Sequence, residues 1–92
     1  MNEEKDLLNL LIDKVECEII QCKDSIKYAK HDIKKLLKSK DGAIEAGIDD
    51  FVFEDKINYL NDIKEKLENR IYKLKKIKYR LDIAKKMIED LN

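Results

Sequence analysis

Lys40–Asp50 reads KDGAIEAGIDD and contains both glycines of the chain, Gly42 and Gly47, in a sequence of 92 residues without proline. Glycine and proline are the strongest helix breakers, so long helices are expected on both sides of this stretch. Gly42 follows a lysine-rich segment and suits the left-handed position just past a helix end. Asp49 or Asp50 suits the N-cap of the next helix. We therefore predict a helix over about 3–40, a loop over about 41–49 and a helix over about 50–91.

Apolar residues recur every seven positions on both sides of this loop. The rows before it are Leu8, Val15, Cys22, Ala29 and Leu36, and Ile12, Ile19, Ile26 and Ile33. The rows after it are Phe53, Leu60, Leu67, Leu74, Leu81 and Ile88, and Ile63, Arg70, Ile77, Ala84 and Leu91. Alternating steps of three and four are typical of coiled coils. The pattern predicts an all-α protein with one domain over 1–92, in which two long helices form an antiparallel coiled-coil hairpin.

Net charge alternates in sign along the chain. Residues 1–24, 25–40, 41–62 and 63–86 carry net charges of −4, +5, −6 and +7. Folding the chain back at its middle lays opposite charges together, whereas parallel copies would bring like charges together. Apolar pairing of the two arms, such as Leu8 opposite Leu81, places the bend at 44–45. An antiparallel dimer of long helices would satisfy the same pattern, so the loop decides between the two arrangements.

Further apolar residues lie outside these rows. The first half of the first helix carries a second stripe, formed by Leu7, Leu10, Cys17 and Ile20. Such a wide apolar face is typical of helix bundles, so the stripe predicts dimerisation into a four-helix bundle, a partner protein or plain exposure. A second group surrounds the loop and consists of Ile44, Ile48, Phe51 and Val52. We favour a small core at the tip for this group, and the alternative is an anchor for a partner.

One segment of the second helix combines tyrosines with basic residues. It contains Tyr72, Lys73, Lys75, Lys76, Tyr79, Arg80 and Lys86. A basic helix with aromatic side chains can lie along nucleic-acid phosphates. We favour the other interpretation, in which this block faces the acidic half of the first helix, because a formal net charge of zero provides no long-range attraction.

No motif for catalysis, phosphate binding or metal binding is present. His31 is the single histidine, and Cys17 and Cys22 are too few to complete a zinc site. We therefore expect a non-enzymatic protein without cofactor or metal. No apolar run is long enough for a membrane span, and the start, MNEEKDLLNLLIDK, lacks a signal-peptide pattern, so a cytoplasmic protein is expected.

The leading functional hypothesis is a small protein–protein interaction module: an adaptor, regulator or inhibitor of a protein partner of unknown identity. The Lys/Ile/Asn-rich composition is compatible with an inhibitor of a host system encoded by a phage or mobile element. A homodimer is expected as well. The first alternative is a nucleic-acid-associated protein that uses the basic surface, and the second is a purely structural homo-oligomer.

Overall fold

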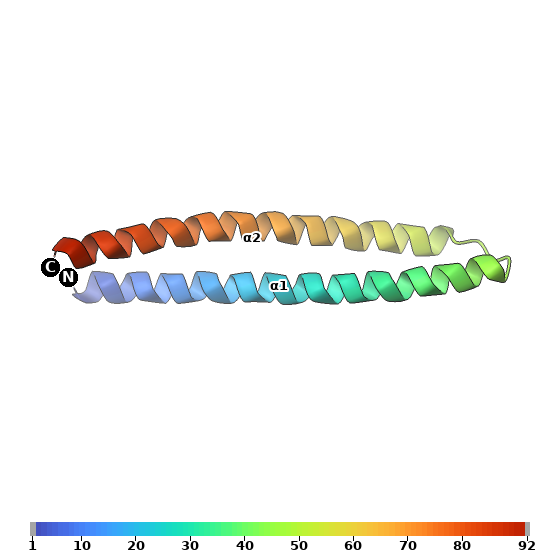
Figure 1. Ribbon diagram of the computed structural model, residues 1–92, viewed down its shortest axis with the longest axis horizontal. Helices are drawn as coiled ribbons and strands as arrows, with labels where there is room; N and C mark the ends of the chain where they lie inside the picture. The colour runs from blue at the N-terminus through green and yellow to red at the C-terminus, as the bar shows by residue number, and fades with distance from the viewer. Residues whose placement is uncertain (1, 92) are drawn as a thin grey trace.

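Two long helices make up the fold. The computed structural model describes residues 2–91, in which α1 (Asn2–Glu45) and α2 (Phe51–Leu91) are joined by a turn over 46–50. The helices lie antiparallel in a rod whose Cα atoms extend over 71 × 14 × 13 Å, with the start of α1 beside the end of α2 (Figure 1). The prediction of an all-α antiparallel hairpin is confirmed.

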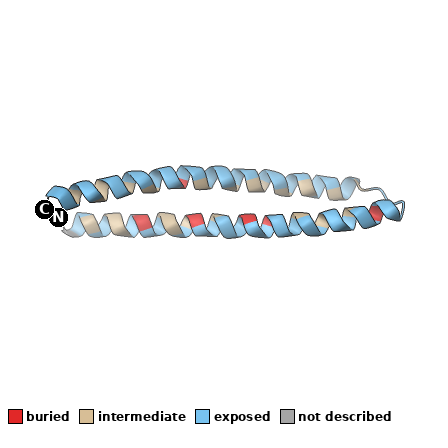
Figure 2. Ribbon diagram, in the orientation of Figure 1, coloured by how far each residue is buried: buried red, intermediate tan, exposed pale blue. Residues whose placement is uncertain are grey.

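The core is a seam of apolar side chains between the helices. On α1 it follows the predicted rows, and on both helices the less exposed residues lie on the facing sides (Figure 2). The buried apolar residues are Ile12, Ile19, Ile26, Ala29, Ala43 and Leu74. Within residues 2–91 no charged side chain is buried, so apolar contact is the main source of tertiary stability.

One predicted row of α2 is wrong by one position. The row that contains Leu74 lies in the seam, but its companion row, which is half-buried throughout, is Ile57, Lys64, Ile71, Lys78 and Lys85. Of the row expected in its place, Arg70, Ile77 and Leu91 are exposed, whereas Ile63 and Ala84 are half-buried. Apolar residues of α2 occur in three rows, and a single partner helix covers only two rows.

The first helix ends five residues later than predicted. Gly42 lies inside α1, and Gly47 is the glycine with a positive φ, of 74°. The Ile48 N–H donates to the Ala43 carbonyl at 2.8 Å, and the Gly47 N–H donates to the Ile44 carbonyl at 3.0 Å. These two bonds form a Schellman motif with Gly47 at the left-handed position. The predicted loop over 41–49 is therefore corrected to 46–50.

Both aspartates of the turn contribute to the start of α2. The Asp49 carboxylate Oδ1 accepts a hydrogen bond from the Phe51 N–H at 3.0 Å. The Asp50 carbonyl accepts hydrogen bonds from the N–H groups of Phe53 and Glu54, at 3.0 and 3.1 Å. Asp50 is thus the first residue in the helical bonding pattern, and the side chain of Asp49 satisfies an N–H that would otherwise lack a partner.

Ion pairs between the arms define the register. Three of them, Lys5–Glu89 (3.4 Å), Glu16–Lys78 (3.0 Å) and Lys40–Glu54 (2.9 Å), are centred on Gly47, whereas Glu18–Arg70 and Lys40–Asp50 are centred on residues 44 and 45. The turn over 46–50 agrees with the first three, so the predicted centre at 44–45 is displaced. The displacement follows from the longer α1, and it slides one helix along the other by about one turn.

We predict that Leu74→Ala lowers the free energy of unfolding by about 2–4 kcal/mol, because Leu74 is only 3% exposed and its truncation leaves a cavity in the seam. Leu10→Ala is the matched control: Leu10 is 65% exposed, so the same change should alter stability by about 0.5 kcal/mol or less. Urea denaturation followed by circular dichroism measures both. Equal losses in the two variants would contradict the seam.

The two glycines form a second matched pair. A Cβ atom at Gly42 or at Gly47 would meet no atom within 4 Å, so only the backbone distinguishes them. Gly42→Ala should stabilise the protein by about 0.5–1 kcal/mol, since alanine favours a helix interior. Gly47→Ala should destabilise it by about 1 kcal/mol, because a side chain is strained at positive φ. Thermal unfolding measures both changes in stability. If Gly42→Ala destabilised the protein and Gly47→Ala stabilised it, α1 would end at Gly42.

Candidate functional site

The tip of the hairpin exposes its apolar residues. Ile44, Ile48, Phe51 and Val52 are between 53% and 71% exposed, so the prediction of a small tip core is wrong. The turn is too short to fold these side chains under it, and the adjacent seam is already filled by Ala43 and the half-buried Phe53. An exposed apolar group confined to one end of a rod is an available contact surface.

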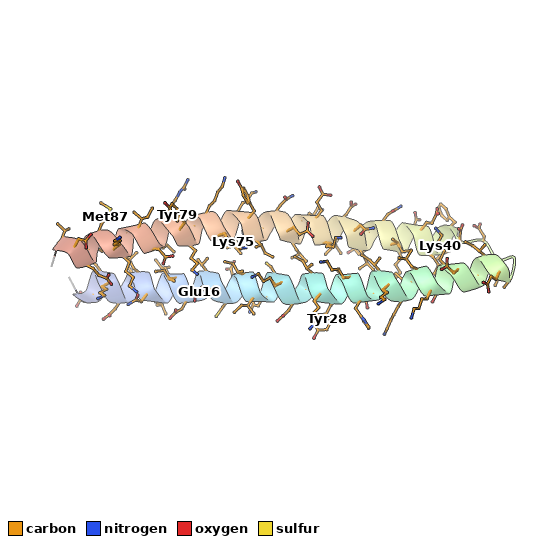
Figure 3. All side chains as sticks on the ribbon, in the orientation of Figure 1. Glu16, Tyr28, Lys40, Lys75, Tyr79 and Met87 are labelled. Carbon is orange, nitrogen blue, oxygen red and sulfur yellow. The ribbon has the colours of Figure 1, made fainter. Side chains whose placement is uncertain are left out.

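The tip is held in one conformation by polar contacts from both helices. Lys40, which lies near the turn (Figure 3), places its Nζ 2.9 Å from Glu54 Oε1 and 3.9 Å from Asp50 Oδ2. The hydrogen bond to Glu54 raises the pKa of Lys40, and the charges of Glu54, Asp50 and Asp41 act in the same direction. Together with the Schellman motif, these contacts join the end of α1 to the start of α2.

Negative charge surrounds the apolar tip. Residues 41–55 contain six acidic side chains and no basic one. The six are Asp41, Glu45, Asp49, Asp50, Glu54 and Asp55. Of these, only Asp50 is half-buried, and the other five are exposed. The tip therefore combines an apolar centre with an acidic rim, which favours contact with a basic surface.

The predicted stripe on α1 is exposed but does not form a single surface. Leu10 and Cys17 are seven residues apart and lie in one row on the side away from the seam. Leu7 and Ile20 are also exposed, yet they are separated by about 140° around the helix axis. The four residues are thus spread over most of the outer face, and no one partner helix could cover them all.

The basic segment of α2 forms an open surface with two tyrosines. Tyr72 and Tyr79 are exposed, and Tyr79 points away from α1 (Figure 3). A shallow depression is lined by Tyr72, Lys75, Lys76, Tyr79 and Arg80. The Lys76 Nζ lies 4.4 Å from the centroid of the Tyr72 ring, a cation–π contact that orients both side chains.

Few of these basic side chains pair with α1. Residues 63–86 contain ten basic residues, but within residues 2–91 only Arg70, with Glu18 (3.0 Å), and Lys78, with Glu16 (3.0 Å), form ion pairs. The hydrogen bond to Glu16 raises the pKa of Lys78. The interpretation that this block faces the acidic half of the first helix therefore holds for Arg70 and Lys78, whereas most of its basic side chains form no ion pair with α1 among the described residues.

Several exposed apolar residues were missed by the sequence analysis, among them Leu11, Ile83 and Met87. Leu11 directly precedes the seam residue Ile12, so it could have been found by asking which apolar residues lie beside a seam row. Met87 points away from α1 in Figure 3 and has no comparable signal in the sequence.

Within residues 2–91, no group of three or more histidine, cysteine or acidic side chains is arranged to hold a metal ion, and neither helix is long and apolar enough to cross a membrane. The chain matches no protein-family model, and no curated protein or solved structure is significantly similar to it. A proposal for its function therefore depends on the surfaces described above.

Proposed function

We propose that the protein is a non-enzymatic protein-binding module that presents its tip to a partner protein. The observation that supports the proposal is the exposure of Ile44, Ile48, Phe51 and Val52 at the end of a 71 Å rod. Clustered apolar side chains at a protruding end are the usual anchors of protein interfaces. Such a module would act as an adaptor, regulator or inhibitor by occupying a surface of its partner.

The chemistry of the tip indicates the partner's surface. Four apolar anchors would fill an apolar pocket, and the six acidic residues of 41–55 would face lysines or arginines at the rim of that pocket. The contacts of Lys40 and the Schellman motif order the tip before it binds. Less conformational entropy is then lost on association, which favours tight binding by a small surface.

We predict that Ile48→Asp or Phe51→Asp weakens partner binding by at least about 30-fold, the effect of losing a hot-spot residue. Tyr28→Asp is the control, because Tyr28 is equally exposed but lies near the middle of α1. Affinity capture from the native cells, with mass spectrometry of the retained proteins, would identify the partner. Titration calorimetry would then measure each variant, and circular dichroism would verify its helix content.

The proposal is wrong if the tip variants retain the same proteins as the unmodified chain with unchanged affinity. It is also wrong if Tyr28→Asp abolishes capture while both tip variants preserve it, since the contact would then lie on the shaft of the rod.

Nucleic-acid binding is a second candidate, favoured by the basic side chains of 63–86 that are left without acidic partners on α1. The tyrosine rings could stack on bases while Lys75, Lys76 and Arg80 contact phosphates. The charge is local and the whole chain is formally neutral, so the expected affinity is weak.

We predict that any binding of a fluorescent single-stranded oligonucleotide weakens steeply between 50 and 200 mM salt, by about tenfold or more, because counterions are released at each phosphate contact. Fluorescence anisotropy measures the effect. Lys76→Glu combined with Arg80→Glu should remove binding, whereas Lys34→Glu combined with Lys38→Glu on α1 should not. Absence of binding at the lower salt concentration would exclude this candidate.

A further inference from the structure

One side of the hairpin carries apolar rows that the seam does not use. The row of Leu11, Glu18 and Ser25 lies one position before the buried row of α1, and the row of Ile63, Arg70 and Ile77 lies one position before the half-buried row of α2. The ion pair between Glu18 and Arg70, at 3.0 Å, places both rows on the same side.

Leu11 and Ile77 belong to these two rows. Leu11 is seven residues before Glu18, and Ile77 is seven residues after Arg70, so both lie on the side of the seam that the Glu18–Arg70 pair marks. They are 39% and 44% exposed, so they form the partly exposed edge of an apolar surface that continues from the seam. We name this surface the Leu11 flank, and it comprises Leu7, Leu11, Ile63, Ile77, Ala84 and Leu91.

The opposite side of the seam is more polar over the same length. The ion pair between Glu16 and Lys78 marks it, and the groove there is lined by four charged residues, Glu16, Lys23, Lys75 and Lys78, together with Ile19 and Ile20. In Figure 3, Glu16 and Lys75 lie between the two helices on the half of the rod away from the turn, which we call the open half. A hairpin stable on its own would have two polar sides, whereas one apolar side is typical of helices in a bundle.

The rod shape also leaves enough exposed area for a further interface. The chain exposes 7369 Å². A compact monomer of 10.9 kDa would expose about 5,600 Å², about 1,800 Å² less. A stable dimer buries about 800 Å² of each partner. The surplus is therefore large enough for the Leu11 flank to be covered by another protein surface of ordinary size.

We propose that a second copy of this chain covers the Leu11 flank and forms a four-helix bundle with both tips at the same end. A two-fold axis along the rod would lay α1 of one copy antiparallel beside α2 of the other. Residues 1–24 (net charge −4) then face residues 63–86 (+7) of the other copy, and residues 25–40 (+5) face residues 41–62 (−6), as they do within one hairpin. This proposal is independent of what the tip binds.

The position of the apolar residues selects this orientation. Leu7, Leu11, Ile77, Ala84 and Leu91 all lie on the open half of the rod, away from the tip. Copies with tips at the same end bring these residues together, because a two-fold axis along the rod sets each residue at the same height as its counterpart in the other copy. Copies with tips at opposite ends would set them against polar residues near the turn.

Polar layers on the same flank would set the register of the dimer. Glu18 would face Arg70 of the second copy as well as its own Arg70. Nearer the tip, Asp32 and Lys56 line one groove, and each would face the oppositely charged residue of the second copy. Such layers cost stability but exclude shifted alignments, since a slip would leave charges unpaired beside apolar residues.

Sedimentation equilibrium of the full chain tests the dimer. The expected mass is twice 10.9 kDa at micromolar concentration. Leu11→Glu combined with Ile77→Glu should weaken association by at least about 100-fold, while Leu10→Glu, on the outer face, should leave the dimer intact. Circular dichroism distinguishes dissociation from unfolding. A monomer at every concentration, a larger oligomer, or a dimer that survives the double substitution would overturn the proposal.

A distance measurement tests the orientation. In a Cys17→Ser, Cys22→Ser background, Ile48→Cys allows one spin label at each tip. Electron–electron resonance should give a distance far shorter than the 71 Å length of the rod if the tips lie together. A distance near that length would contradict the arrangement. Asp24→Cys, exposed at mid-rod on the outer face, serves as the control because its two labels lie at the same level in either orientation.

Discussion

Apolar contact along a single seam is the interaction on which the rest of the structure depends. Neither helix can bury its apolar side alone, and helices of this composition gain most of their stability from packing rather than from intrinsic propensity. Ile19, at the level of Leu74, belongs to the best-covered part of that seam. The ion pairs are exposed, so they select antiparallel pairing and its register while adding little free energy. The turn and the surfaces are arranged around this line of contact.

The architecture could be predicted from the sequence because the seven-residue repeat and the alternating charge each indicate the same folding back. The exact bend could not be placed as well, since Gly42 and Gly47 both suit a helix end. A signal was present, because Ala43 continues the row of Leu8 and Leu36 by one more repeat and is buried. On α2, three rows contain apolar residues and only two can lie in the seam. Each of the two competing rows mixes apolar with basic residues, so the sequence alone does not choose between the row of Ile71 and the row of Arg70. The half-buried side chain of Ile71 shows the outcome.

The surfaces were less accessible to prediction for a physical reason. Whether Ile48 is covered depends on the length of the turn, and whether Lys76 is neutralised depends on which acidic side chains lie within reach; both follow from the register. The sequence identified the residues of the tip correctly but assigned them to a core. The Glu18–Arg70 pair places Leu11 and Ile77 on one side of the seam, so the same packing of the two helices accounts for an apolar flank and for an unneutralised basic face.

The start of α1 and the end of α2 lie side by side, a rod's length away from the turn (Figure 1). Anything attached to either end would therefore be kept remote from the tip. The fold behaves as a stiff spacer: immobilised by its chain ends, it would display the turn some 7 nm above a support, an estimate that follows from the rise per residue of a helix. The same geometry would permit insertion of the whole hairpin into a surface loop of another protein with little separation of the loop's two ends.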